Sequence, residues 1–152
     1  MSVKPLIYLD TTIPSAYYDR RAEERRLNTI EFWEDKLNRY RTHISALTIN
    51  ELSQTVDLRL KKDLLALVAG MDQIKVVEPM HTLAGIYVQK GIFPARYYID
   101  ALHAAVATCA GMAHLVSWNF EHLVQVKTRH LVSAVNAANG YKPLEIVSPL
   151  EL

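Results

Sequence analysis

The sequence predicts a single α/β domain with a mostly parallel sheet. Short apolar runs alternate with longer helical segments along the chain, which is typical of parallel sheets. Half of the 152 residues are hydrophobic and 22% are charged, as in an ordinary globular domain with one core. The five glycines and six prolines are scattered, so no linker or internal repeat divides the chain. We therefore expect one domain over residues 1–152.

Five short runs are predicted to form buried strands, because each is apolar or β-branched and is closed by a polar or turn residue. The first of them, Leu6–Leu9, stops at Asp10. The second is rich in β-branched side chains. In chain order, the expected strands cover residues 6–9, 42–49, 74–77, 114–118 and 144–147.

Helices are predicted between these strands. Thr12 is a suitable N-cap for the first helix, with Pro14 in its opening turn. An apolar stripe of Ile30, Trp33 and Leu37 repeats at helical spacing, and we assign it to the core or to a protein interface. The first expected helix begins at Thr12, the second carries the stripe over residues 27–37, and a third begins at Glu51. Four more helices are expected over residues 60–70, 82–89, 95–110 and 128–139.

Composition excludes several classes of protein. Seventeen basic and 16 acidic residues give a net charge of +1, so any basic surface for nucleic acid must be local. Cys109 is the single cysteine, which excludes an intramolecular disulfide and a multi-cysteine zinc site. The sequence contains neither a glycine-rich phosphate loop nor a serine elbow. With no long apolar span and no signal-like start, we expect a cytoplasmic protein.

Four polar residues stand where an α/β fold places its ligands, near the carboxyl ends of strands. Asp10 follows the first strand, Glu51 lies two residues past the second, and Asn119 follows the fourth. Asp100 is an isolated acid in an alanine-rich, largely apolar helix. Most other acids belong to charged runs that are typical of solvated surface, so these positions stand out.

Carboxylates gathered in one place repel each other, and they stay ionised only when a cation is bound. Oxygen ligands without cysteine favour Mg²⁺ or Mn²⁺ over zinc. A Mg²⁺ site keeps several waters and binds phosphate, which suits hydrolysis of a phosphodiester by a metal-bound water. The acids therefore predict a hydrolytic metal site.

Each acid also has a purely structural alternative. Asp10 is placed to cap the helix that follows it. Glu51 fits a capping box that begins at Thr48. Asp100 has Arg96 one turn earlier as a surface partner. The joint pattern favours the metal site over the three separate explanations.

Taken in order, four segments resemble the PIN domain, in particular the stand-alone PIN proteins that include the VapC-like toxins of type II toxin–antitoxin pairs. The segments are Leu9-Asp10-Thr11, residues 47–52, residues 99–105 and residues 115–120, and the resemblance covers essentially the whole chain. It implies a three-layer α/β/α sandwich around a mostly parallel five-stranded sheet, with a Mg²⁺- or Mn²⁺-dependent endoribonuclease site.

Carried over by position, the resemblance implies that Asp10 and Asp100 are the principal metal ligands and that Glu51 holds or orients a metal-bound water. Ser117 matches a small hydroxyl residue beside the fourth acid of the family. Asn119 stands at that fourth acidic position and departs from the pattern. An amide oxygen can ligate Mg²⁺ but adds no charge and cannot act as a base, which favours one metal ion over two.

The resemblance also implies partners: structured RNA such as transfer or ribosomal RNA, a second copy of the chain, and a cognate antitoxin that enters the site. Thr11 and His103 are auxiliary candidates, and a satisfied core histidine is the alternative for His103. Candidate RNA-phosphate ligands cluster within seven residues: Arg20, Arg21, Arg25 and Arg26. Their alternative is a solvated helix face paired with Glu23 and Glu24.

Three other functions stay open. A catalytically weakened PIN module would bind RNA or a protein without turnover, with Asn119 marking the loss of the site. A Mg²⁺-dependent phosphatase would need an aspartate two residues after Asp10, where Thr12 stands. A DNA-directed nuclease of the same fold is the third, because nothing in the sequence reports recognition of a 2′-hydroxyl.

Overall fold

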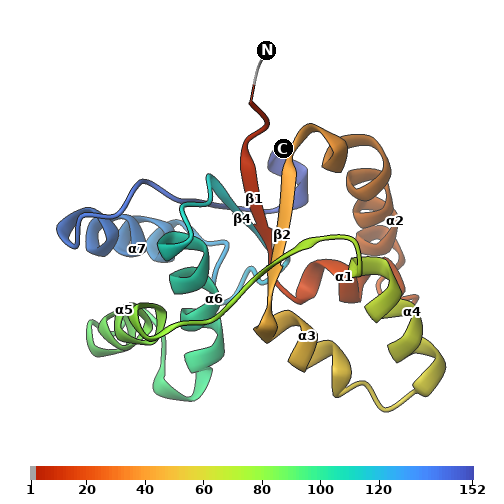
Figure 1. The fold of residues 1–152 in the computed structure, drawn as a ribbon, viewed down its shortest axis with the longest axis horizontal. Coiled ribbons are helices and arrows are strands. Elements are labelled where there is room, and N and C mark those ends of the chain that lie inside the picture. Colours follow the sequence, from red (N-terminus) through yellow and green to blue (C-terminus); the bar gives the residue numbers. More distant parts are fainter. Residues whose placement is uncertain (1–2) are drawn as a thin grey trace.

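The computed structural model describes residues 3–152 and places a five-stranded sheet between two layers of helices (Figure 1). All four strand pairs are parallel, and the strand order is β3-β2-β1-β4-β5. The strands are β1 (Leu6–Leu9), β2 (Arg41–Ser45), β3 (Asp72–Ile74), β4 (His114–Val116) and β5 (Glu145–Val147). The expected α/β/α sandwich with five strands is confirmed, and its sheet is entirely parallel.

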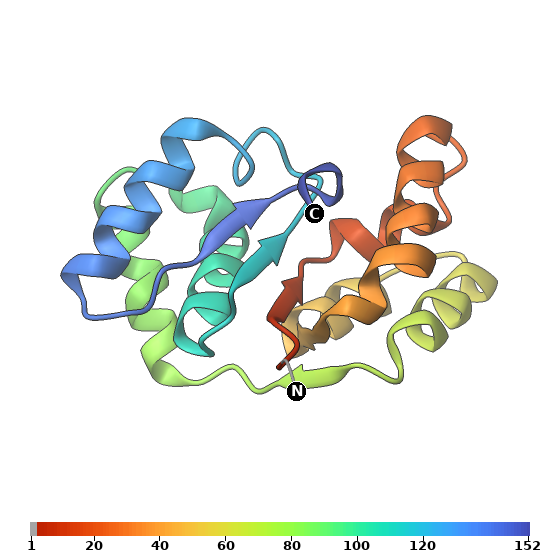
Figure 2. The same cartoon turned by 90° about the horizontal axis from the view of Figure 1, so that it is seen from above.

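Helices cover both faces of the sheet. Figure 2 shows α5–α7, in green to blue, on one side and α1–α4, in red to olive, on the other. The α-helices are α1 (Thr12–Tyr17), α2 (Glu23–Glu31), α3 (Ala46–Ser53), α4 (Leu58–Val68), α5 (Glu78–Gln89), α6 (Tyr98–Cys109) and α7 (Val126–Ala138). Shorter turns of helix are η1 (Phe32–Lys36), η2 (Leu37–Arg39), η3 (Ala95–Tyr97) and η4 (Pro149–Glu151).

Two apolar cores follow from the alternation of side chains along the strands. Ile7 and Leu9 of β1 pack in one core with residues of α1, η1, α3 and α4. Tyr8, between them, packs in the other core with residues of α5–α7. Leu115 and Val116 of β4 divide between the two cores in the same way. β1 is therefore buried on both faces, as its continuous apolar sequence predicts.

The chain changes direction across the sheet at β1. Strands β2 and β3 are added on one side of β1, and β4 and β5 on the other. Ligands of such sheets bind outside the carboxyl ends of the strands at this switch point. The fold thus directs attention to the residues that follow β1 and β4.

The second expected strand is too long. It ends at Ser45, whose hydroxyl caps α3 by accepting the Leu47 amide at 3.2 Å. Residues 46–49 are helical although they are rich in β-branched side chains, because a cap at Ser45 outweighs weak strand propensity. The capping box from Thr48 to Glu51 is therefore wrong, since both residues lie inside α3.

Other boundaries also shift. The third strand covers residues 72–74 instead of 74–77, because residue 78 already begins α5. The N-cap position of α1 is occupied by Thr11 and not by Thr12. The helix expected over residues 95–110 opens with a 3₁₀ turn, so Asp100 lies in the first turn of α6. Among residues 3–152, we find no helix whose length and hydropathy would let it cross a membrane.

Candidate active site

Asp10 lies at the switch point of the sheet. It follows β1 directly, and its backbone amide donates to the Val116 carbonyl of β4 at 3.2 Å. The Ser117 and Thr12 hydroxyls each donate to one oxygen of its carboxylate at 2.5 Å, and the Thr12 amide adds a bond of 3.1 Å. The Thr12 amide belongs to the first turn of α1, so Asp10 satisfies a free amide at the start of this helix while it also lies in the site.

The Asp10 carboxyl is almost completely buried. It is 3% exposed, and within the described chain it forms no ion pair with a basic side chain. Burial raises the pKa of Asp10, although the nearby His103 and the bonds from Ser117 and Thr12 partly oppose this shift. A divalent cation at the carboxyl edge would relieve the cost of keeping this group ionised.

Glu51 reaches the same edge from α3. Its Oε1 accepts the Thr11 hydroxyl at 2.8 Å and His103 Nε2 at 2.7 Å. Its side chain is 39% exposed. Partial burial by itself raises the pKa of Glu51, but the hydrogen bond and charge of His103, together with Thr11, bring that pKa below its ordinary value. Glu51 is therefore held as a carboxylate.

A buried hydrogen-bond chain runs behind Glu51. Tyr8 Oη lies 2.6 Å from His103 Nδ1 and 2.7 Å from Ser45 Oγ. An ionised Glu51 only accepts, so His103 Nε2 donates to it. In the neutral ring Nδ1 then accepts from Tyr8, and Tyr8 accepts from Ser45, which itself accepts the Leu47 amide. His103, at 3% exposure, is thus both a satisfied core histidine and a direct partner of the site.

Asp100 reaches the site from the first turn of α6. Its Oδ2 lies 2.9 Å from Nδ1 of His122, on the loop after β4. The side-chain oxygen of Asn119 accepts the His122 amide at 2.9 Å and so shapes that loop. The Arg96 guanidinium packs over the Tyr97 ring at 5.0 Å and forms no ion pair with Asp100 in the described chain.

His122 could not be identified from the sequence, because its spacing from the other histidines is not that of a metal-ligand motif. It lies 22 residues beyond Asp100 and meets that carboxylate only through tertiary structure. The one local signal is an asparagine three residues before it, placed to accept its amide. Asn119 therefore lies at the site, and its side-chain oxygen accepts the backbone amide of His122.

The structure brings Glu51 and Asp100 to the walls of one pocket of about 400 Å³ between α3 and α6. Asp10 is not among the residues that line this pocket, but it is next in sequence to Thr11, whose hydroxyl binds Glu51. Among residues 3–152, no three acidic, histidine or cysteine side chains lie close enough together to coordinate one ion in this arrangement. The oxygen donors fit Mg²⁺ or Mn²⁺, which are bound through one or two carboxylates and several waters.

Two of the four candidate arginines are paired within the protein. Arg21 binds Asp19 at 2.9 Å and Arg26 binds Glu23 at 2.6 Å. For Arg26, the alternative is therefore confirmed: this arginine is paired with Glu23 on the face of α2. Arg20 is exposed on the loop that precedes α2.

Arg25 lies closer to the site. Its guanidinium is 5.3 Å from the Trp118 ring centroid and 5.9 Å from that of Phe120. The Trp118 amide donates to the Thr12 hydroxyl at 2.9 Å, and that hydroxyl binds Asp10. Of the cluster, Arg25 is thus connected to the acidic edge through packed neighbours.

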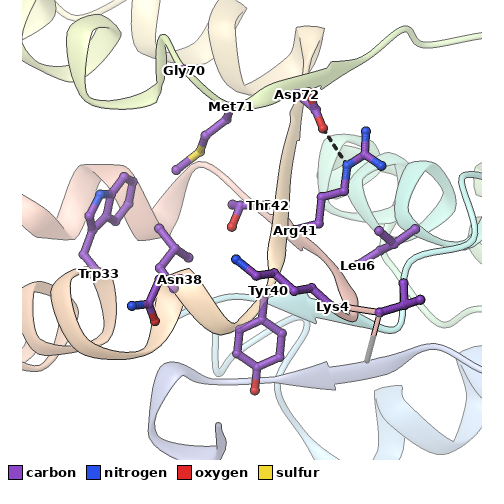
Figure 3. Close-up of a pocket in the computed structure, with 12 residues that line it drawn as sticks. Lys4, Leu6, Trp33, Asn38, Tyr40, Arg41, Thr42, Gly70, Met71 and Asp72 are labelled. Atoms are coloured by element: carbon purple, nitrogen blue, oxygen red, sulfur yellow. Dashed lines mark hydrogen bonds and ion pairs between the residues drawn. The ribbon is translucent and has the colours of Figure 1, made fainter. Parts of the chain in front are cut away.

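A larger pocket, of about 600 Å³, lies at the opposite edge of the sheet (Figure 3). It adjoins the amino ends of β1 and β2, and Trp33 and Leu37 of the predicted apolar stripe line its wall. Two of its lining residues, Arg41 and Asp72, form an ion pair with an N–O distance of 3.0 Å. None of the predicted acids lies there, so pocket size alone would select a different part of the molecule.

No family model matches the sequence, and no curated protein matches it. Solved structures do match in three dimensions. VapC20 from Mycobacterium tuberculosis, a toxin that cleaves the sarcin–ricin loop, is 14% identical; the match covers 91% of this chain and 98% of that chain, with a TM-score of 0.60. VapBC2 from Rickettsia felis, bound to a DNA fragment from their promoter, is also 14% identical, with coverage of 94% and 98% and a TM-score of 0.56. The chain thus has the fold of VapC structures, as the resemblance in its sequence predicts.

Proposed function

We propose that the protein is a Mg²⁺- or Mn²⁺-dependent endoribonuclease and the toxin of a type II toxin–antitoxin pair. The observation that carries this proposal is Asp10, a carboxyl buried at the switch point of the sheet with no ion-pair partner among residues 3–152. Glu51 and Asp100 converge on the same edge from two different helices. The fold shared with VapC20, a toxin that cleaves the sarcin–ricin loop, supports the same class of reaction.

In this proposal Asp10 and Asp100 hold the cation, and Glu51 orients a water bound to it. The bound cation supplies an activated water and neutralises charge on the phosphodiester. Ser117 and Thr12 fix the Asp10 carboxylate by donating to both of its oxygens. His103 and Thr11 hold one oxygen of Glu51, so both bonds restrain the direction of its carboxylate.

Asn119 makes a single cation the expected occupancy. The two ligands Asp10 and Asp100 balance the charge of one divalent ion, and the neutral Asn119 amide adds no charge toward a second. Its oxygen is already used by the His122 amide, which leaves less capacity for a second ion.

The proposal includes partners and a compartment. The VapBC2 structure supports a cognate antitoxin as one partner. We further propose structured RNA, such as transfer or ribosomal RNA, as substrate, a homodimer as the working form, and the cytoplasm as the location.

The test is cleavage of end-labelled structured RNA by antitoxin-free protein in Mg²⁺, Mn²⁺ or EDTA, beside an Asp10→Asn control. We expect cleavage in either metal and none in EDTA or with the variant. Cleavage that survives both EDTA and Asp10→Asn would contradict the proposal. Single-stranded DNA of the same sequence tests the DNA-directed alternative.

A second candidate is a PIN module that binds RNA or a protein without turnover. The specific observation in its favour is Asn119, a neutral residue whose oxygen is engaged by backbone. Folded protein that binds RNA but cuts none of it in any metal would support this candidate over the nuclease.

A further inference from the structure

The pocket shared by Glu51 and Asp100 has a rim that the acid chemistry does not require. Two exposed amides, one in α3 and one at its C-cap, contribute to the lining, and so do an arginine and a tyrosine from η3. Besides the acids, the lining residues are Leu47, Asn50, Gln54, Arg96, Tyr97 and Ile99. Arg96 is the only basic residue among them, and within residues 3–152 it forms no ion pair with a carboxylate.

Tyr97 is the centre of a stack of flat groups. Its ring centroid lies 4.0 Å from that of His122, with the planes inclined by 39°. The Arg96 guanidinium lies 5.0 Å from the same centroid. His122 in turn bonds Asp100 at 2.9 Å, so this stack begins beside the acids. Aromatic rings and guanidinium planes are the groups on which proteins stack unpaired bases.

Asn50 and Gln54 add hydrogen-bonding groups to the lining of the pocket that holds the acids. They lie one helical turn apart, Asn50 in α3 and Gln54 at its C-cap, on either side of Glu51 in sequence. Both residues are exposed. A side-chain amide offers a donor and an acceptor together, which matches the edge of a nucleobase. The Arg96 guanidinium offers paired donors suited to a phosphate.

We propose that this pocket binds one unpaired nucleotide of an RNA strand, next to the phosphate that is cut. Its base replaces the Arg96 guanidinium on the Tyr97 ring, its edge meets Asn50 and Gln54, and the displaced Arg96 takes an adjacent phosphate. The inference rests on the proposed nuclease function and adds the requirement that the RNA be single-stranded at this nucleotide. A base in a duplex has its faces stacked and its edge paired, so it cannot enter.

The test uses short unstructured RNAs that carry 2-aminopurine, titrated in Mg²⁺ into full-length Asp10→Asn protein, which is expected to bind without cutting. Fluorescence reports stacking of the base, and anisotropy reports affinity. Adding Tyr97→Ala should weaken binding by roughly fivefold to 150-fold, the usual value of one base–aromatic stack, and abolish the fluorescence change. Tyr97→Phe should keep both signals. Tyr40→Ala, a half-buried tyrosine at the opposite edge of the sheet, is the matched control and should change neither.

Two results would overturn the subsite: unchanged affinity of Tyr97→Ala, or equal binding of the same RNA annealed to its complement. Gln54→Ala, an exposed position, gives an independent measurement if Tyr97→Ala does not fold, with an expected loss of roughly fivefold for one hydrogen bond. The proposal would also be refuted if Gln54→Ala kept wild-type affinity for the RNA and Tyr97→Phe gave no change in 2-aminopurine fluorescence. If wild type cuts RNA and Tyr97→Ala binds normally, the subsite fails and the nuclease stands. If binding depends on Tyr97 while no RNA is cut, the nuclease fails and the subsite stands.

Discussion

Replacing Tyr8 with phenylalanine separates the buried hydrogen-bond chain from the core that surrounds it. The ring remains and fills its place in the fully buried core, while the hydroxyl that bonds His103 and Ser45 is lost. Losing two hydrogen bonds, which leaves the His103 Nδ1 acceptor and the Ser45 hydroxyl without this partner, costs about 1–1.5 kcal/mol each, or about 2–3 kcal/mol of unfolding free energy. For a chain of this size that corresponds to a fall in Tm of about 4–12 °C.

The same change should also slow cleavage. Without the Tyr8 hydroxyl, Nδ1 of His103 loses its hydrogen-bond donor, and the ring that bonds Glu51 is held from one side only. Loss of a residue that orients a metal-site ligand typically costs about 10–100-fold in metal affinity or activity. We therefore expect kcat to fall by about that factor, with KM for RNA little changed, because neither Tyr8 nor His103 lines the pocket.

Tyr87→Phe is the matched control. Tyr87 is also fully buried in the same core, and its hydroxyl bonds Asn136 and, at 3.3 Å, Thr108. None of these residues touches the acids, so this variant should lose comparable stability and keep wild-type kcat. Urea unfolding and initial cleavage rates measure the two quantities separately. Equal kcat in Tyr8→Phe and Tyr87→Phe, at equal stability, would refute the role given to the chain behind Glu51.

Three further predictions follow from the site. Asp10→Asn should raise Tm in EDTA, because burial disfavours the charged carboxyl. It should also abolish the rise in Tm that we expect Mn²⁺ to cause in wild type. A lower Tm of the variant in EDTA would contradict this reading. Asn119→Asp keeps an acceptor for the His122 amide and adds a fourth carboxylate, so calorimetry should detect a second Mn²⁺ per chain, and unchanged stoichiometry would count against it. Arg25→Ala should reduce the slope of log Kd for RNA against log salt by about 0.7 per lost phosphate contact, whereas Arg26→Ala, already paired with Glu23, should leave the slope unchanged.

Positions of strands and acids were predictable because they depend on local pattern. The continuous apolar run before Asp10 predicts a strand buried on both faces, and the fold makes β1 its central strand. Parallel strands bring their carboxyl ends to one edge, which is why Asp10 and Ser117 meet although they are 107 residues apart. Both conclusions need only periodicity and the direction of the sheet.

Interactions that depend on competition between neighbours were not predictable in this way. Thr48 and Glu51 have the spacing of a capping box, but Ser45 caps the helix first and frees the Glu51 carboxylate for Thr11 and His103. A local motif cannot report which of two possible caps the chain uses. The outcome depends on Tyr8, whose buried hydroxyl also bonds Ser45.

The histidine partners of the acids needed the tertiary structure. His103 faces Glu51 because α6 packs beside β1, and His122 faces Asp100 because the turn after β4 folds back toward α6. Neither contact has a sequence spacing that identifies it. The pairing of Asp100 with Arg96, which has such a spacing, does not form, and Arg96 packs on Tyr97 instead.

Calorimetric titration of Mn²⁺ into antitoxin-free wild type and Asp10→Asn tests the central claim, that Asp10 forms a divalent-cation site, most directly. We predict one ion per chain in wild type and no binding in the variant, with both proteins folded. Equal binding by the two proteins, or no binding by folded wild type, would contradict the assignment of Asp10 as a metal ligand.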